Sequence, residues 1–213
     1  MCGRSSIWFS PQELKERYDA ELEYDYEPSY NVAPKSTNPV IKNESKDKIS
    51  GLRWGLVPPW ADDPSIGNRM INARAETLGE KTSFKDAYER RRCIVPANAF
   101  FEWTGERGNK QPYLVKFKDD RCFSMAGLWE RWSRDGDDNT LQTYTVITTE
   151  PNDIVGELHD RMPVILSREE EDVWLDEGHR RDDLLNPCPS DEMEYYPVSR
   201  RANERLEGGH REG

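Results

Sequence analysis

A cysteine follows the first methionine of the chain, and its position suggests a particular chemistry. Loss of Met1 would leave Cys2 with a free α-amine, whose pKa is ordinarily about 7.7 to 8.0, beside a thiol with a pKa of about 8.5. Both groups are then partly nucleophilic at neutral pH. Such a 1,2-aminothiol captures aldehydes, because the amine forms a Schiff base and the thiolate then closes a thiazolidine ring. Taken alone, however, a cysteine at position 2 is more often a residue without a function.

Thiazolidine formation needs an acid to expel water and a base to relay protons, and two side chains are candidates. Glu102 stands in the apolar run "AFFEW", on the same strand face as Phe100. Poor solvation there would raise the pKa of its carboxyl, although a carboxylate at the rim of a strand end is the alternative. His159 directly precedes an apolar strand in "ELHDRMPVIL", whereas His179 follows a helix-ending glycine and His210 is in the tail. A histidine with purely structural partners is the alternative at His159.

The segment "INARAET" adds a polar row to these candidates. As a strand it places Asn72, Arg74 and Glu76 on one face and small apolar residues on the other. Such a row lines a cleft or, with equal support from the pattern, forms a solvated face with an internal ion pair.

The segments that must position these residues are mostly strands. Capping patterns predict helices that start at Ser10, Ser83 and Ser167, the last ending at Gly178, and a short helix near Pro151. Strands are predicted in "GLRWGLVPPW", "RCIVPANAFFEW", "QPYLVKF", "CFSMAGLWERW", "LQTYTVITT", "MPVIL" and "MEYYPVS". Because the strands follow one another without regular alternation with helices, the sequence predicts an α+β fold with a mainly antiparallel sheet.

Length and composition indicate the class of protein. A chain of 213 residues is expected to form one domain. No apolar run is long enough for a membrane span or resembles a secretory signal, so we expect a cytoplasmic protein without a membrane partner. The four cysteines are scattered without zinc-type spacing, which predicts free thiols, no metal and no cofactor.

The charge balance is strongly acidic, with 41 acidic and 30 basic residues and a formal net charge of -11. The negative net charge by itself argues against a nucleic-acid partner, because phosphate contacts need local positive charge. Net charge is not local charge, however, and acidic stretches such as "SREEEDVWLDE" leave room for a small arginine-lined groove. An acidic surface that keeps the protein soluble in a salty cytoplasm explains the total without reference to function.

Six motifs occur in order along the chain: "MCGR", "YNVAP", "RWGLVPPWA", "INARAET", "RCIVPANAFFEW" and "LHDRMPVIL". Together they resemble the SOS response-associated peptidase (SRAP) family. The resemblance implies a barrel-like α+β domain over residues 1–199 and a tail over 200–213, which we expect to lack fixed structure. It also implies a protein that loses Met1, binds single-stranded DNA, and crosslinks Cys2 to the ring-opened aldehyde of an abasic site as a thiazolidine. We expect a monomer with self-processing and lyase-type activity that is associated with the nucleoid when bound to DNA, although the sequence leaves open whether Met1 is removed by self-cleavage or by an aminopeptidase.

The resemblance also assigns roles to residues by motif. Cys2 is the nucleophile, and Asn72 orients the N-terminus. Glu102 is the acid and base, and His159 assists ring opening and crosslinking. The expected DNA contacts are Arg4, Arg74 and Arg161 at the phosphates, and Trp60 and Trp103 against the bases.

Two other functions stay open at this point. One is an N-terminal-nucleophile peptidase or amidohydrolase, in which Cys2 attacks a carbonyl carbon. The other is a non-catalytic binder of single-stranded DNA that uses only its tryptophans and arginines, for which Cys2 would be dispensable. One test separates the three functions: whether abasic-site single-stranded DNA forms a denaturant-resistant adduct with the protein that depends on Cys2.

Overall fold

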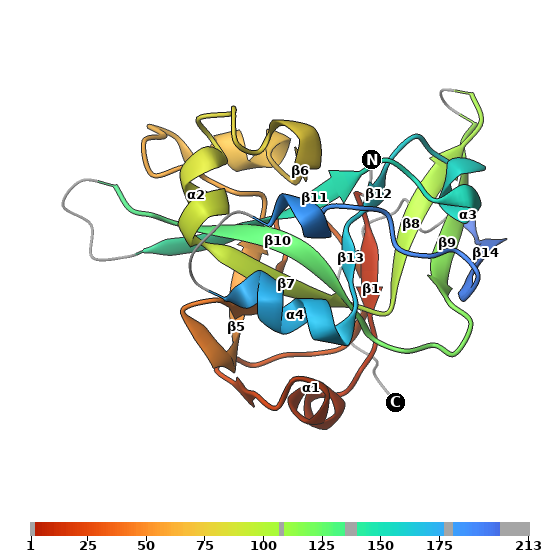
Figure 1. Ribbon diagram of the computed structural model, residues 1–213, viewed down its shortest axis with the longest axis horizontal. Coiled ribbons are helices and arrows are strands. Elements are labelled where there is room, and N and C mark those ends of the chain that lie inside the picture. The colour runs from red at the N-terminus through yellow and green to blue at the C-terminus, as the bar shows by residue number, and fades with distance from the viewer. Residues whose placement is uncertain (1–2, 107–108, 135–139, 177–180, 201–213) are drawn as a thin grey trace, which may run out of the picture.

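The computed structural model describes residues 3–106, 109–134, 140–176 and 181–200, which form two β-sheets with short helices around them (Figure 1). The strands are β1 (Ser5–Ile7), β2 (Glu21–Leu22), β3 (Ser29–Val32), β4 (Thr37–Lys42), β5 (Ser45–Trp54), β6 (Asn72–Arg74), β7 (Arg92–Ala97), β8 (Ala99–Thr104), β9 (Gln111–Phe117), β10 (Phe123–Trp132), β11 (Leu141–Thr149), β12 (Met162–Pro163), β13 (Ile165–Leu166) and β14 (Met193–Pro197). The helices are α1 (Pro11–Tyr18), α2 (Lys85–Arg90), α3 (Asp153–Gly156) and α4 (Arg168–Leu175), with 3-10 turns η1 (Pro64–Arg69), η2 (Ala75–Thr77) and η3 (Asp182–Leu184). Within these ranges no helix has the length and apolar character that a membrane crossing requires. The expected tail lies outside the described residues from position 201 onward.

Five strands of the larger sheet close into a barrel. They follow the order β11-β10-β7-β4-β5, and a parallel pairing of β5 with β11 completes the ring, with Trp54 opposite Tyr144. These two rings are buried and stack with 6.1 Å between their centroids. The α+β fold with a barrel-like, mainly antiparallel core is therefore confirmed.

The second sheet contains the start of the described chain. Its strand order is β14-β9-β8-β1-β3, so β1 is paired on both edges, with Ser5 opposite Val32 of β3 and Phe100 of β8. All three residues of β1 are buried. A buried strand held between two neighbours has a strongly specified register, because a slip by one residue would turn its buried side chains to the other face. This sheet therefore determines where the first described residues lie.

The predicted strand "RCIVPANAFFEW" is in fact two strands in different sheets. β7 belongs to the barrel and β8 to the second sheet, and the chain passes from one to the other at Asn98. Asn98 is fully buried. Its side chain accepts a hydrogen bond from the backbone N–H of Trp8 at 2.9 Å and donates one to the backbone carbonyl of Asp120 at 3.3 Å. A polar side chain with distant partners thus ends one strand and begins the next.

The capping patterns predict most helix starts correctly. Ser10 and Ser167 form complete capping boxes at α1 and α4, and the short helix expected near Pro151 is α3. The start predicted at Ser83 is wrong, because Ser83 lies in a turn one residue before the N-cap of α2, and that helix has no side-chain cap. Gly178, the predicted end of α4, lies outside the described residues.

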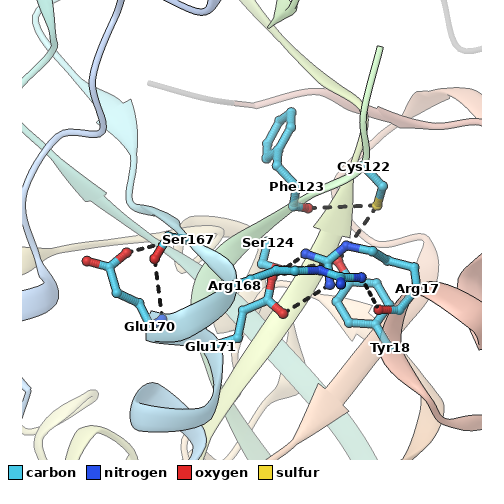
Figure 2. Close-up of polar contacts among 9 residues, drawn as sticks. All are labelled: Arg17, Tyr18, Cys122, Phe123, Ser124, Ser167, Arg168, Glu170 and Glu171. Carbon is cyan, nitrogen blue, oxygen red and sulfur yellow. Dashed lines mark hydrogen bonds and ion pairs between the residues drawn. The ribbon is translucent and has the colours of Figure 1, made fainter. Parts of the chain in front are cut away.

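A buried ion pair ties α1 to α4 and to the barrel (Figure 2). Arg17 of α1 donates to both carboxylate oxygens of Glu171 of α4, with Nη1 3.1 Å from Oε2. The hydroxyl of Ser124 on β10 donates to Glu171 Oε1 at 2.7 Å. The side chains of Arg17 and Glu171 are only 15% and 11% exposed. Because α1 closely follows β1 in the chain, this pair also secures the downstream end of the first strand.

Replacing Glu171 by alanine should leave the Arg17 guanidinium buried without its counter-charge. We expect Glu171→Ala to lower the free energy of unfolding by about 3 to 5 kcal/mol, measured by urea denaturation. The neighbouring Asp172 is exposed on the same helix, so Asp172→Ala should change stability by about 0.5 kcal/mol or less. Equal losses in the two variants would show that the buried pair is not what holds α1 and α4 together.

Candidate active site

The register of β1 against β8 brings the start of the described chain beside Glu102. The two strands are antiparallel, and the N–H of Phe101 donates to the carbonyl of Arg4 at 3.0 Å. Continuing this register by one residue puts Gly3 opposite Glu102. Cys2, the predicted nucleophile, lies outside the described residues.

Glu102 is a buried acid. It is 1% exposed, and burial is the main reason that its pKa rises from the ordinary 4.5 to about 7. The negative charge of Asp160 raises this pKa further, whereas the positive charge of Lys110 lowers it. The raised pKa expected from the apolar neighbours of Glu102 is therefore found. A carboxyl with this pKa can both donate and accept protons near neutral pH.

His159 lies just after α3, and its ring is held by the two residues that follow it. The backbone N–H of Arg161 donates to His159 Nδ1 at 3.0 Å, and Asp160 Oδ1 lies 2.8 Å from the same nitrogen. Nδ1 accepts from Arg161 when it carries no hydrogen, and it donates to Asp160 in the neutral Nδ1–H tautomer or in the charged ring. Burial is the largest of the effects that lower the pKa of His159, which favours the neutral ring.

Glu102 and His159 share one electrostatic environment. The charge of Asp160 raises the pKa of both groups, and the charge of Lys110 lowers the pKa of both. Because such interactions weaken with distance, two groups that respond to the same pair of charges belong to one neighbourhood. The fold thus brings a residue of β8 together with the turn after α3.

Strand β11 connects the remaining parts of the site. β6 carries Asn72 and runs parallel to β11, with Arg74 opposite Thr148. β12, which directly follows the His159 turn, pairs with the end of β11, and the Arg161 guanidinium donates to the Thr148 carbonyl. Thr148 itself is fully buried. β11 therefore brings the "INAR" strand next to the segment that carries His159.

The segment "INARAET" does not form the single strand that its alternation predicts. Only Asn72–Arg74 is a strand, and η2 follows it, so Glu76 leaves the polar face of the strand. In the turn, its carboxylate instead accepts two hydrogen bonds from Arg161, at 2.6 and 3.0 Å. Arg161, expected as a phosphate contact, has a side chain only 11% exposed, and its guanidinium is bonded to Glu76 and to the Thr148 carbonyl.

The other predicted DNA contacts differ in exposure. Trp60 is 55% exposed, and Trp103 is half-buried at the end of β8. Arg74 is exposed, whereas Arg4 Nη1 donates to Asn31 Oδ1 at 2.8 Å. The DNA-binding role of these side chains stays a prediction.

Three neighbours of the site were not predicted, namely Asn31, Asp160 and Lys110. The first two stand inside the motifs "YNVAP" and "LHDRMPVIL", so membership of a motif was a usable signal. Lys110 had no such signal: it directly precedes β9, the strand that pairs with β8, and its charge lowers the pKa of Glu102. In the part of the chain that the structure describes, no group of His, Cys, Asp or Glu side chains could hold a metal ion.

Comparison with known proteins decides the family. The family model described as SOS response associated peptidase (SRAP) matches residues 1–205. The chain belongs to the SRAP family.

Among SRAP relatives, the abasic site processing protein YoqW of Bacillus subtilis (strain 168) is 43% identical over 212 residues, which cover 95% of this chain and 94% of that protein. The abasic site processing protein HMCES of Xenopus tropicalis is 30% identical over 247 residues, covering 93% of this chain and 73% of the relative. A crystal structure of a protein from Bacteroides thetaiotaomicron has a TM-score of 0.87 to this SRAP chain at 31% identity, covering 94% and 93% of the two chains. The family resemblance drawn from the motifs is therefore confirmed.

The raised pKa of Glu102 should make the stability of this SRAP protein depend on pH. In the fold Glu102 keeps its proton up to about pH 7, whereas in the unfolded chain it ionises near 4.5, so folding becomes less favourable as pH rises between these values. Glu102→Gln is neutral throughout. The variant should therefore gain about 3 kcal/mol of unfolding free energy relative to the wild type between pH 4.5 and pH 8.

Denaturant unfolding at several pH values measures this difference. Glu106→Gln removes an exposed carboxylate just beyond the end of β8, and its stability should run parallel to that of the wild type. A constant difference between wild type and Glu102→Gln across the range would show that Glu102 does not titrate as described.

Proposed function

We propose that this SRAP protein captures abasic sites in single-stranded DNA through an N-terminal Cys2, exposed by loss of Met1, and holds the lesion as a thiazolidine crosslink. Relatives named abasic site processing proteins support the choice of substrate. An abasic site is in equilibrium with a ring-opened aldehyde, which is the electrophile that a 1,2-aminothiol traps.

The observation that carries this proposal is the register of β1 against β8. The pairs between these two strands and the Phe101–Arg4 hydrogen bond, continued by one residue, would set Gly3 opposite Glu102. Cys2 is joined to Gly3 by one peptide bond, so their Cα atoms are about 3.8 Å apart. The described chain therefore starts near a buried carboxyl whose pKa is about 7, one peptide bond after the residue that would carry the amine and the thiol. A carboxylate with only a structural role would need neither the raised pKa nor the position beside the first described residues.

The crosslink forms in two steps that balance. The α-amine first adds to the aldehyde carbon, and the carboxyl of Glu102 protonates the departing oxygen, so water leaves and an imine remains. The Cys2 thiolate then adds to the imine carbon, forming a C–S bond, while the imine nitrogen takes up one proton and becomes a secondary amine. The ionised Glu102 regains the proton that the amine lost, and the net products are thiazolidine and water.

His159 and Asn72 complete the proposed chemistry. The ring N–H of neutral His159 could donate a hydrogen bond to the ring oxygen of the cyclic abasic sugar and so assist its opening, while the proton lost by the anomeric hydroxyl and the proton gained by the ring oxygen exchange with solvent. Asn72, on β6, orients the amino terminus. The same arrangement, with Cys2 acting on the peptide bond that precedes it, would serve removal of Met1 by the protein itself.

The proposed DNA contacts combine a few cations with aromatic surfaces. Arg4 and Arg74 would contact phosphates, and the exposed ring of Trp60 and the edge of Trp103 would stack against bases near the lesion. Stacking depends little on salt. Each phosphate contact to a single strand, in contrast, steepens the slope of log affinity against log salt concentration by about 0.7. An acidic protein with few such contacts therefore relies on the covalent step for retention.

The decisive experiment mixes processed protein with a single-stranded oligonucleotide that contains one abasic site. The wild type should give a heat-resistant adduct on a denaturing gel. Cys2→Ala keeps the amine, so it should give only an imine that requires borohydride for trapping. Cys188→Ala, which removes a half-buried thiol elsewhere, should behave as the wild type. A heat-resistant adduct from Cys2→Ala would remove the thiazolidine from the mechanism.

The role of Glu102 is tested by rate rather than yield. Glu102→Gln keeps the shape of the side chain and loses its proton transfer, so the crosslinking rate at saturating protein should fall by about 100-fold or more. Affinity for the undamaged oligonucleotide, measured by fluorescence anisotropy, should change little. Parallel loss of rate and affinity would mark Glu102 as a structural residue.

A further inference from the structure

The second sheet carries aromatic side chains on the face that is turned away from the main core. Phe100 of β8 belongs to that core, whereas Phe101 lies on the opposite face of the strand, in a small separate cluster with Leu114 of β9. Trp8 and Trp103 pack against this small cluster and are half-buried. The sheet therefore has an inner face in the core and an outer face whose aromatic side chains are partly exposed.

A hollow of about 470 Å³ lies on the outer face. Its lining includes Trp8, Tyr30, Phe101, Leu114, Tyr196 and Val198. The rings of Trp8 and Tyr30 stack, with centroids 5.8 Å apart and planes inclined by 18°. Tyr30 is nevertheless 71% exposed and Tyr196 is 43% exposed. Large apolar groups that are exposed together around one hollow are typical of a surface that binds a ligand.

This hollow is almost without charge, although the protein as a whole is strongly acidic. Among the described residues that line it, Asp120 alone is charged, and its carboxylate accepts a hydrogen bond from Lys116 Nζ at 2.7 Å. The lining therefore offers little to a cationic partner and repels an anionic one less than the rest of the surface does. Nucleobases fit such a surface, because they stack on aromatic rings without any need for charge.

Two of the proposed DNA contacts lie on the same outer face. The N–H of Phe101 donates to the carbonyl of Arg4, so these two residues are opposite each other and their side chains share a face. Trp103 follows Phe101 by two residues on β8, and their ring centroids are 6.2 Å apart. Glu102, between them, faces the other way. A DNA strand with its lesion at Glu102 and a neighbouring base on Trp103 therefore has to turn over the end of β8 onto the outer face.

We propose that the outer face of the second sheet is a stacking track for single-stranded DNA, which leads from Trp103 along β8 to the Trp8–Tyr30 pair. The inference rests on the proposed function, because that function sets Trp103 against the bases next to the lesion. Ser6 is opposite Ala99 and donates to the Tyr30 carbonyl, so Tyr30 lies level with the start of β8. From Trp103 to that level the strand rises about 13 Å, the length of about four stacked bases.

The first test measures the affinity of an undamaged single strand of about 16 nucleotides for the wild type, Tyr30→Ala and the matched control Tyr30→Phe. Fluorescence anisotropy gives the dissociation constants. Tyr30→Ala should bind about 5- to 100-fold more weakly, which corresponds to the loss of one stacked base. Tyr30→Phe keeps the ring and should match the wild type. The ratio between wild type and Tyr30→Ala should stay constant across a salt series, because stacking adds no phosphate contact.

The second test uses crosslinking to locate the track relative to the lesion. With an abasic site in the middle of the long strand, Tyr30→Ala should slow crosslinking at limiting protein by the same factor as it weakens binding. At saturating protein it should match the wild type, because no reacting group has changed. With only about two nucleotides on each side of the lesion, the strand is too short to reach Tyr30, so both proteins should crosslink at the same rate at every concentration.

The outcomes separate the track from the proposed function. If the wild type forms no adduct, the crosslinking mechanism fails, while a weakened affinity of Tyr30→Ala for the long strand still supports the track. If the wild type crosslinks and Tyr30→Ala binds the long strand as tightly as Tyr30→Phe does, the track is wrong.

Two further results would overturn the track. One is a lower urea midpoint of unfolding for Tyr30→Ala than for the wild type, with binding of short and long strands weakened alike, because that result marks Tyr30 as a structural residue. The other is a wild type that sediments as a dimer and a Tyr30→Ala variant that sediments as a monomer, because the hollow then binds a second copy of the chain.

Discussion

The pairing of β1 on both edges is the interaction on which the rest of the site depends. In the proposed function the reactive groups belong to the residue just before Gly3, and β1 is the described strand nearest to it in the chain. The three residues Ser5–Ile7 are held in place because β3 and β8 bind them from the two edges, and the Arg17–Glu171 pair secures the helix that follows. The first described strand thus lies between two other strands, where a shift of register is costly. An edge strand of the same length would leave its end free to fray.

The same sheet gives the site its acid at a cost in stability. Glu102 is carried on β8 into an interior that disfavours its ionised form, and burial is the largest cause of its raised pKa. His159 is also shifted mainly by burial, in the direction that keeps its ring neutral. The site therefore holds a carboxyl that is protonated below about pH 7 and an imidazole whose neutral form is favoured. Functional sites commonly keep such groups although neutral replacements would make the fold more stable.

Sequence reasoning succeeded where the signal is local. A capping box is complete within four residues, so Ser10 and Ser167 could be predicted, and the apolar neighbours of Glu102 sufficed to predict its raised pKa. It failed where a distant partner decides the structure. Asn98 divides one apolar run between two sheets through bonds to remote segments, and Glu76 leaves its strand for an arginine far along the chain. No periodicity within a short window contains that information.

The strand order also determines how much of the chain must be synthesised before the site can form. β1 cannot pair with β8 until the chain has grown past residue 104, and the turn that carries His159 reaches β11 only when β12 has been made. At about 5 to 20 residues per second, a ribosome needs roughly 8 to 30 seconds to proceed from β1 to β12. During that interval the amino terminus has emerged without the strands that later enclose its neighbourhood. Any step that needs Glu102 and the His159 turn together must therefore wait until β12 has been made.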